Sequence, residues 1–88
     1  MEKFGILVKV YDDCKYNANS KKVSEAIYND VEKFEVKTIS DEEMYAQGFD
    51  VVDKFGEYAI LTFTNGETAT FRNSYVDVFK LQEVNMNW

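Results

Sequence analysis

The sequence lacks histidine and proline and contains one cysteine and one arginine. Histidine is the commonest general base and the commonest metal ligand, so its absence argues against most acid–base catalysis and most transition-metal sites. The lone cysteine, Cys14, can form neither an intrachain disulfide nor a thiolate zinc site. The glycines are isolated and form no phosphate-binding loop. We therefore expect no enzymatic activity, no metal and no cofactor.

Long hydrophobic runs are also missing. No apolar segment approaches the ~18 residues that a membrane-spanning helix needs, and residues 1–10 alternate too regularly for a signal peptide. An unpaired cysteine fits a reducing compartment better than an oxidising one. These features predict a soluble, cytoplasmic protein that does not engage a membrane.

What is present indicates a single compact domain over residues 1–88. The chain is 45% apolar and 16% aromatic, a composition that builds a core and does not stay disordered. Typical domains have ~50–250 residues, so a second independent core does not fit.

The first half of the chain predicts one strand and then two helices. Residues 4–11 alternate with period two, which predicts a strand, and its wholly apolar face consists of Phe4, Ile6, Val8 and Val10. The Asp- and Asn-rich residues 12–19 predict a loop. A helix is then expected over residues 20–32, because an apolar stripe recurs there at helical spacing, made of Val23, Ala26, Ile27 and Val31.

A short strand is expected over residues 34–40. Ser40 and Glu43 have the spacing of a capping box, which predicts a second, shorter helix that ends at Gly48.

The second half of the chain predicts β-structure. Strands are expected over residues 49–55, 58–64, 67–72 and 75–81, and residues 82–88 read as a tail. Asn65-Gly66 is a strong signal for a two-residue hairpin of type I′. Such a loop places Thr64 opposite Glu67, with Ile60, Ala69 and Phe71 on the core face and with Leu61 and Phe63 on the outer face.

The expected fold class is therefore α+β, an antiparallel sheet of four to five strands with one or two helices on one face. The outer face of an antiparallel sheet is normally wet. Because Leu61 and Phe63 are large and apolar, we expect a helix or a partner to cover them.

Charge is distributed unevenly along the chain. The sequence holds 16 acidic and 10 basic residues, and residues 30–57 alone hold nine acids and three bases, which equals the whole net charge of −6. An acidic surface steers a basic partner, although a solvated face that keeps a small protein soluble explains the same composition. The candidate partner-binding residues are Asp30, Glu32, Glu35, Asp41, Glu42, Glu43, Asp50, Asp53, Leu61 and Phe63.

In its small size, its acidity, its absent catalytic residues and its lysine-rich, arginine-poor composition, the chain resembles small phage-encoded inhibitors of the anti-CRISPR and DNA-mimic type. The resemblance rests on no motif and covers the chain in overall character only. It implies that the acidic side chains of residues 30–57 imitate nucleic-acid phosphates. They would then block the basic groove of a nucleic-acid-handling host protein, such as a CRISPR effector, in the host cytoplasm.

Two other function classes stay open. One is a structural or assembly module that homo-oligomerises, for example as a homodimer, through its exposed sheet face. The other is a small-ligand or nucleotide-sequestering protein. Direct binding of nucleic acid is not expected, because one arginine in a negatively charged chain supplies few phosphate contacts.

Overall fold

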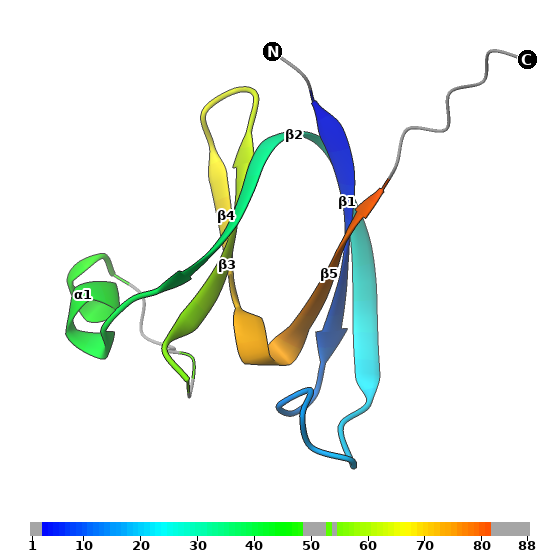
Figure 1. The fold of residues 1–88 in the computed structure, drawn as a ribbon, viewed down its shortest axis with the longest axis vertical. Coiled ribbons are helices and arrows are strands. Elements are labelled where there is room, and N and C mark those ends of the chain that lie inside the picture. The colour runs from blue at the N-terminus through cyan, green and yellow to red at the C-terminus, as the bar shows by residue number, and fades with distance from the viewer. Residues whose placement is uncertain (1–2, 49–52, 54, 82–88) are drawn as a thin grey trace, which may run out of the picture.

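The computed structural model describes residues 3–48, 53 and 55–81. These residues form one antiparallel sheet of five strands in the spatial order β4-β3-β2-β1-β5 (Figure 1). In chain order the elements are β1 (Phe4–Tyr11), β2 (Lys22–Thr38), α1 (Asp41–Ala46), β3 (Glu57–Phe63), β4 (Thr68–Arg72), the 3₁₀ turn η1 (Asn73–Tyr75) and β5 (Val76–Leu81).

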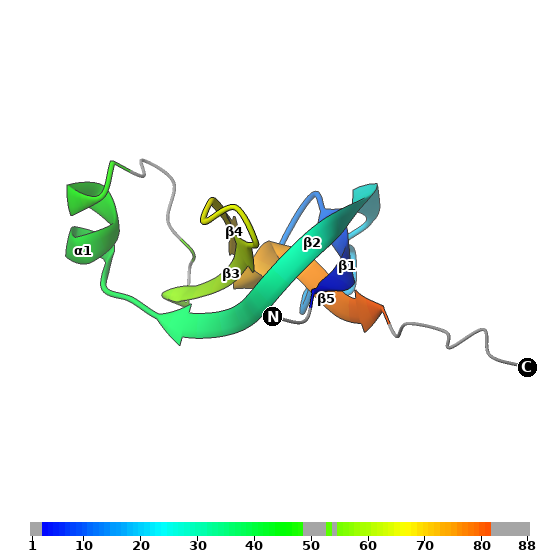
Figure 2. The same cartoon turned by 90° about the horizontal axis from the view of Figure 1, so that it is seen from above.

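The expected α+β class is wrong, because the described residues are mostly sheet and include one short α-helix. That helix, α1, has six residues and lies off one end of the sheet, not across a face (Figures 1 and 2). A helix was expected over residues 20–32, but residues 22–32 instead supply the first half of β2. Helical spacing is a weak signal where tertiary pairing is available. Here the chain returns antiparallel to β1 and pairs with it, with Ala26 opposite Val8 and Tyr28 opposite Ile6.

β2 is a 17-residue strand that belongs to both halves of the sheet, the half that contains β1 and β5 and the half that contains β3 and β4. Its first half pairs with β1, and its second half, which contains the strand expected over 34–40, pairs with β3. The pairing is irregular on both sides of Val31, and Asp30 has a φ of 60°. Aspartate is one of the few residues that adopt this left-handed conformation without a large penalty. The bend lets the sheet curl on itself (Figure 2).

The curled sheet buries its own inner face. The fully buried core residues are contributed by β1, β2, β3 and β5, and they are Ile6, Val8, Val31, Ala59, Leu61 and Val76. The prediction that Phe4, Ile6, Val8 and Val10 face the core is confirmed, since Phe4 and Val10 pack against this cluster. Because both halves of one sheet supply the core, it forms without a covering helix.

The hairpin between β3 and β4 has a three-residue loop, so the expected two-residue type I′ turn is wrong. The Gly66 N–H donates to the Phe63 carbonyl and the Phe63 N–H donates to the Glu67 carbonyl, both at 2.9 Å. Gly66 has a φ of 88° while Asn65 does not enter the left-handed region. This is the pattern of a type I turn followed by a left-handed glycine.

The longer loop shifts the register of the hairpin by one residue. Leu61 lies opposite Ala69 and Ile60 lies opposite Thr70. Since a shift of one residue moves every side chain to the other face, Leu61 points into the core and Ile60 lies on the outer face. The expected assignment of faces is therefore reversed for β3, whereas Ala69 and Phe71 of β4 pack against the core as expected.

The short helix after Ser40 is confirmed. The Ser40 hydroxyl oxygen accepts the Glu43 N–H at 3.2 Å, and Gly48, with a φ of 91°, follows the helix end. The strand expected over 49–55 lies outside the described residues except for Asp53 and Phe55, which belong to no strand. The tail over 82–88 also lies outside them.

Candidate interaction surface

Three segments that are distant in sequence meet at the lower end of the molecule in Figure 1: the loop of residues 12–21, the residues just before β3, and η1. Ser74 in η1 joins all three. Its carbonyl accepts the Lys15 N–H at 2.7 Å, and its own N–H and hydroxyl both donate to Oδ2 of Asp53 at 2.8 Å. The loop and the segment before β3 are therefore held through one buried serine.

The loop of residues 12–21 is organised by its two aspartates. Asp12 Oδ1 accepts the Lys21 N–H at 2.9 Å. Asp13 Oδ1 accepts the Cys14 N–H at 2.7 Å, and Asp13 Oδ2 accepts an Asn17 side-chain N–H at 3.0 Å. The predicted loop is thus confirmed, and its carboxylates close it by bonding to its own backbone and side chains.

Lys15 fastens this loop to β5. Its ammonium group donates to the Val76 carbonyl at 2.8 Å and lies 3.6 Å from the Asp77 carboxylate. With the backbone bond to Ser74, these contacts fix both the main chain and the side chain of the residue that precedes Tyr16.

Asp53 fixes the segment before β3. It is only 1% exposed. Besides the two bonds from Ser74, its carboxyl group accepts the Phe55 N–H at 2.7 Å, and its own N–H donates to the Tyr58 hydroxyl oxygen at 2.8 Å. Among the described residues no buried side-chain nitrogen or oxygen lacks a hydrogen-bond partner. This burial is fully compensated, as a structural polar cluster requires.

The two anchored segments bring Tyr16 and Phe55 together as an exposed aromatic pair. Their ring centres are 5.9 Å apart and the rings meet edge to face, with 72° between their planes. Tyr16 is 66% exposed and Phe55 is 48% exposed. Two large rings in solvent, each on a loop that is held by hydrogen bonds, are unusual for a surface that serves packing alone.

The turn η1 adds a third ring beside its serine. Tyr75 is half-buried, and the guanidinium carbon of Arg72 lies 3.9 Å from the centre of its ring. On the neighbouring strands, the Tyr11 hydroxyl donates to the Asp77 carboxylate at 2.7 Å. That hydrogen bond, together with burial and the negative charge of Asp77, raises the pKa of Tyr11.

The acidic residues expected to form one partner-binding surface are spread over the molecule. Asp30 lies at the bend of β2 and forms an ion pair with Lys3 at 2.8 Å. Glu35 lies between Lys33 and Lys37, at 3.4 and 3.2 Å. Burial raises the pKa of Glu35, but the hydrogen bonds from Lys37 and Lys33 outweigh it, so the net shift of the pKa is downward. Both carboxylates therefore already face a lysine of the same chain.

Of the remaining acidic candidates in the described residues, only three adjacent ones on α1 are exposed together. Asp41, Glu42 and Glu43 occupy its first turn, where the helix dipole favours negative charge. Glu32 is half-buried, Asp53 is fully buried, and Asp50 lies outside the described residues. The second half of β2 separates Asp30 from α1 by roughly 25 Å of strand.

The two apolar candidates do not lie on an open sheet face. Leu61 is fully buried in the core and Phe63 packs against it. The outer face instead exposes a row across β2, β1 and β5, in which Ile27 and Phe79 flank Leu7.

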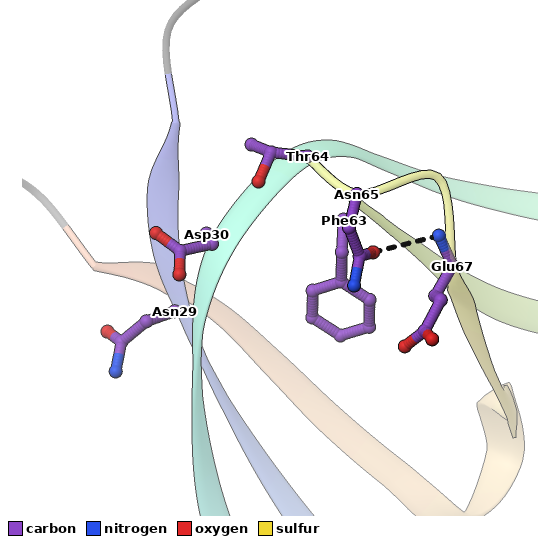
Figure 3. A pocket seen from close by; sticks show the side chains of 6 residues that line it. All are labelled: Asn29, Asp30, Phe63, Thr64, Asn65 and Glu67. Atoms are coloured by element: carbon purple, nitrogen blue, oxygen red, sulfur yellow. Dashed lines mark hydrogen bonds between the residues drawn. The ribbon is translucent and has the colours of Figure 1, made fainter.

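A shallow hollow of about 330 Å³ lies at the bend of β2, beside the hairpin loop (Figure 3). Its lining consists of Asn29, Asp30, Phe63, Thr64, Asn65 and Glu67. Lys3 already pairs with the Asp30 carboxylate, and the Asn65 side-chain oxygen accepts the Glu67 N–H at 3.0 Å. Asp30 and Asn65 therefore serve the bend and the hairpin loop.

Searches of protein-family models, curated proteins and solved structures found no match for this chain. Within the described ranges, no three His, Cys, Asp or Glu side chains group closely enough to hold a metal ion. Among the described residues, no helix is long and apolar enough to cross a membrane.

Sequence reasoning missed the aromatic pair. Tyr16 stands in a run of polar residues, DDCKYNAN, where a large ring has no core neighbour along the chain. A large aromatic residue within a polar loop was the sequence signal that could have pointed to an exposed ring. Its contact with Phe55, 39 positions later, depends on how Ser74 joins the two segments.

Proposed function

We propose that this protein is a non-enzymatic binding module that recognises another protein through the aromatic pair, Tyr16 and Phe55. The observation that carries the proposal is a pair of rings, 66% and 48% exposed, on loops that are fastened to the fold by a buried hydrogen-bond cluster. Aromatic side chains dominate the energetic centres of protein interfaces.

Rigidity supports this assignment. A side chain that is ordered before binding loses little conformational entropy in the complex. Tyrosine and phenylalanine also have only two side-chain torsions, so they offer a large contact area at a low entropic cost. The contacts of Lys15, Ser74 and Asp53 provide this order in the free protein.

An affinity capture experiment tests the proposal. Beads carrying the wild-type protein, the double variant Tyr16→Ala/Phe55→Ala, or the matched double variant Tyr45→Ala/Phe79→Ala are incubated with a bacterial lysate. Tyr45 and Phe79 are 55% and 46% exposed and belong to α1 and β5. We expect a protein that the wild type and the matched control retain and that the Tyr16/Phe55 variant loses. If both double variants capture the same proteins as the wild type, the proposal fails.

A second candidate is the acidic inhibitor of a nucleic-acid-handling protein. The exposed carboxylates of Asp41, Glu42 and Glu43, with no basic residue in the last turn of α1, favour it. Neutralising all three to Asn or Gln should then slow association with a basic partner at low salt, since rim charges act mainly on the association rate. The effect should shrink toward 1 M salt, where the Debye length is ~3 Å. An unchanged association rate in a folded triple variant would argue against this candidate.

A further inference from the structure

The loop between β3 and β4 contains the only asparagine in the sequence that a glycine follows, Asn65-Gly66. The side-chain amide carbon of an asparagine, Cγ, can be attacked by the backbone nitrogen of the next residue. A following glycine favours this attack because it has no side chain to cover its nitrogen. The pair is therefore a candidate site of covalent self-modification.

The structure leaves this pair open to solvent. Residues 64–68 are all exposed, and apart from Gly66 and its two chain neighbours no described residue has an atom within 4 Å of where a Gly66 Cβ would be. The Gly66 N–H donates to the Phe63 carbonyl at 2.9 Å, and this bond must open before the nitrogen can react. It lies at the tip of an exposed loop, where local opening costs least.

A backbone donor is already directed at the side-chain oxygen that would become negatively charged. The Glu67 N–H donates to Oδ1 of Asn65 at 3.0 Å (Figure 3). During attack on Cγ, negative charge develops on this oxygen, and a fixed N–H stabilises such charge without reorganisation. The loop therefore supplies an electrophile that is hydrogen-bonded for attack, beside a nucleophile that no side chain covers.

Asn73 and Asn29 lie in more ordered surroundings. Asn73 precedes Ser74, which is 1% exposed and whose N–H donates to the buried Asp53 carboxylate at 2.8 Å. This nitrogen is therefore both covered and bonded to a charged acceptor. Asn29 lies within β2 and precedes Asp30, whose side chain crowds the nitrogen.

The two asparagines of the loop of residues 12–21 are also less exposed to this reaction. The Asn17 side chain uses both of its polar atoms, since it donates to Asp13 and accepts the Asn19 N–H, each at 3.0 Å. Asn19 precedes Ser20, which is half-buried and donates its N–H to the Asn17 carbonyl at 3.0 Å. Among the described asparagines, the surroundings thus favour reaction at Asn65.

We propose that Asn65 is a site of spontaneous deamidation, with water as the only co-reactant. The Gly66 nitrogen loses its proton and bonds to Cγ of Asn65, the bond between Cγ and Nδ2 breaks, and ammonia leaves with a proton equivalent to the one lost. One water molecule then opens the resulting succinimide ring at either of its two carbonyls. Opening at one carbonyl gives aspartate, and opening at the other gives isoaspartate, in which the main chain runs through the side-chain carbons.

The two products act differently on the hairpin. Aspartate keeps an oxygen that accepts the Glu67 N–H, and it adds a third carboxylate to the lining of the hollow, beside Asp30 and Glu67 (Figure 3). Isoaspartate lengthens the main chain between Phe63 and Gly66 by one carbon. The Gly66 N–H then loses the geometry of its bond to the Phe63 carbonyl.

The test follows the full-length protein during storage at mildly basic pH, either folded or unfolded in guanidinium chloride. Peptide mapping by mass spectrometry locates each converted asparagine, and methylation by a protein isoaspartyl methyltransferase detects isoaspartate. In the folded protein we expect Asn65 to convert first, with release of ammonia and an acidic shift of the isoelectric point. Asn19 and Asn73 should convert appreciably only in the unfolded chain. Asn65→Gln, whose longer side chain forms the cyclic intermediate much less readily, should remove the early conversion.

Two outcomes overturn the proposal. One is that Asn65 stays intact in the folded protein over the time in which it converts in guanidinium chloride. The other is that a different asparagine of the folded protein converts first.

The two products are then separated by ion exchange, and hydrogen exchange of the Gly66 amide is measured in each by nuclear magnetic resonance. We expect faster exchange in the isoaspartate form, because its longer main chain weakens the bond to the Phe63 carbonyl. Equal exchange in both forms would contradict the difference proposed between the products.

Discussion

At the scale of single residues, Asp53 shows how one buried side chain positions an exposed surface. Sequence places it in an acidic segment, where it is expected to face a partner. The structure instead buries it and gives its carboxyl group three donors, from Ser74 and Phe55. A buried polar group is costly unless it is paired, and here the pairing itself links two loops. The role of Asp53 at the aromatic pair is therefore that of a positioning residue.

Replacing Asp53 by Asn should loosen this end of the molecule. In the wild-type protein both carboxylate oxygens accept hydrogen bonds. The amide of asparagine has one acceptor oxygen and one donor nitrogen, so in the variant the nitrogen would face another hydrogen-bond donor. We expect a loss of roughly 1–3 kcal/mol of unfolding free energy, the cost of an unsatisfied buried group, measured by urea denaturation. Nuclear Overhauser contacts between Tyr16 and Phe55 should weaken as well. Glu67→Gln, at an exposed carboxylate, is the control, and equal stability of the two variants would contradict the assignment.

Tyr11 should ionise later than an exposed tyrosine. Its hydrogen bond to Asp77, together with burial and the charge of Asp77, raises its pKa above 10.0. Because the folded-state pKa is the higher one, the stabilisation is complete below the unfolded-state pKa and is lost as the pH rises through the folded-state pKa. In an ultraviolet absorbance titration, Asp77→Asn should move the ionisation of Tyr11 to lower pH. The Tyr11→Phe variant identifies which part of the absorbance curve belongs to Tyr11. If Asp77→Asn leaves that part of the curve unchanged, Asp77 does not control the ionisation of Tyr11.

At the scale of elements, the β3–β4 hairpin depends on one left-handed glycine. Gly66 has a φ of 88°, and apart from the glycine and its two chain neighbours no described residue has an atom within 4 Å of where its Cβ would be. Substitution there is therefore opposed by backbone conformation and not by crowding. β-Branched residues resist this conformation most strongly, whereas asparagine tolerates it.

Gly66→Val should destabilise the protein by roughly 1–3 kcal/mol. Gly66→Asn should cost clearly less, because it keeps access to the left-handed region. The comparison is made by thermal or urea unfolding of both variants with the wild type. Equal stability of the two variants would mean that the left-handed conformation does not control this loop.

The elements that sequence predicted correctly are those specified locally. β1 is specified by strict alternation, and the start of α1 by Ser40 and its bond to the Glu43 N–H. The first half of β2 was misassigned because its apolar residues satisfy helical spacing, while the deciding interaction, pairing with β1, is not local. The hairpin register differed because one extra loop residue, invisible in composition, reverses the faces of β3 relative to β4, while Ala69 and Phe71 stay on the core side as expected.

The candidate site was harder to predict than the fold. Acidic residues were expected to gather because they are close in sequence, but β2 is extended and carries Asp30 far from α1. Two of those carboxylates also form ion pairs within the chain, with Lys3, Lys33 and Lys37. The aromatic pair comes from loops on either side of β2, which only the curl of the sheet brings together. Sequence neighbourhood therefore failed where the surface is built from chain-distant segments.

At the scale of the whole molecule, most of the basic groups in the described ranges already have a partner within the chain, which leaves few for nucleic acid to bind. Arg72 is stacked on Tyr75, and Lys33 and Lys37 both contact Glu35. Lys3 pairs with Asp30 and Lys15 with Asp77. Binding to a phosphate backbone is driven by the release of counterions when several cations engage phosphates together. On this protein those cations already face carboxylates or rings.

We therefore expect no specific binding of DNA or RNA by the protein alone. Binding is measured by gel shift or fluorescence anisotropy at ~150 mM salt. We expect it to be no tighter than non-specific binding, whose Kd is about 10⁻⁴–10⁻⁶ M. Glu35→Gln is an informative second variant, because it frees Lys33 and Lys37 from their carboxylate without removing a cation. If wild-type binding is weak because its cations are paired, this variant should bind slightly more tightly and with a steeper salt dependence. Submicromolar binding by the wild type would show that the net charge and these pairings do not control its encounter with nucleic acid.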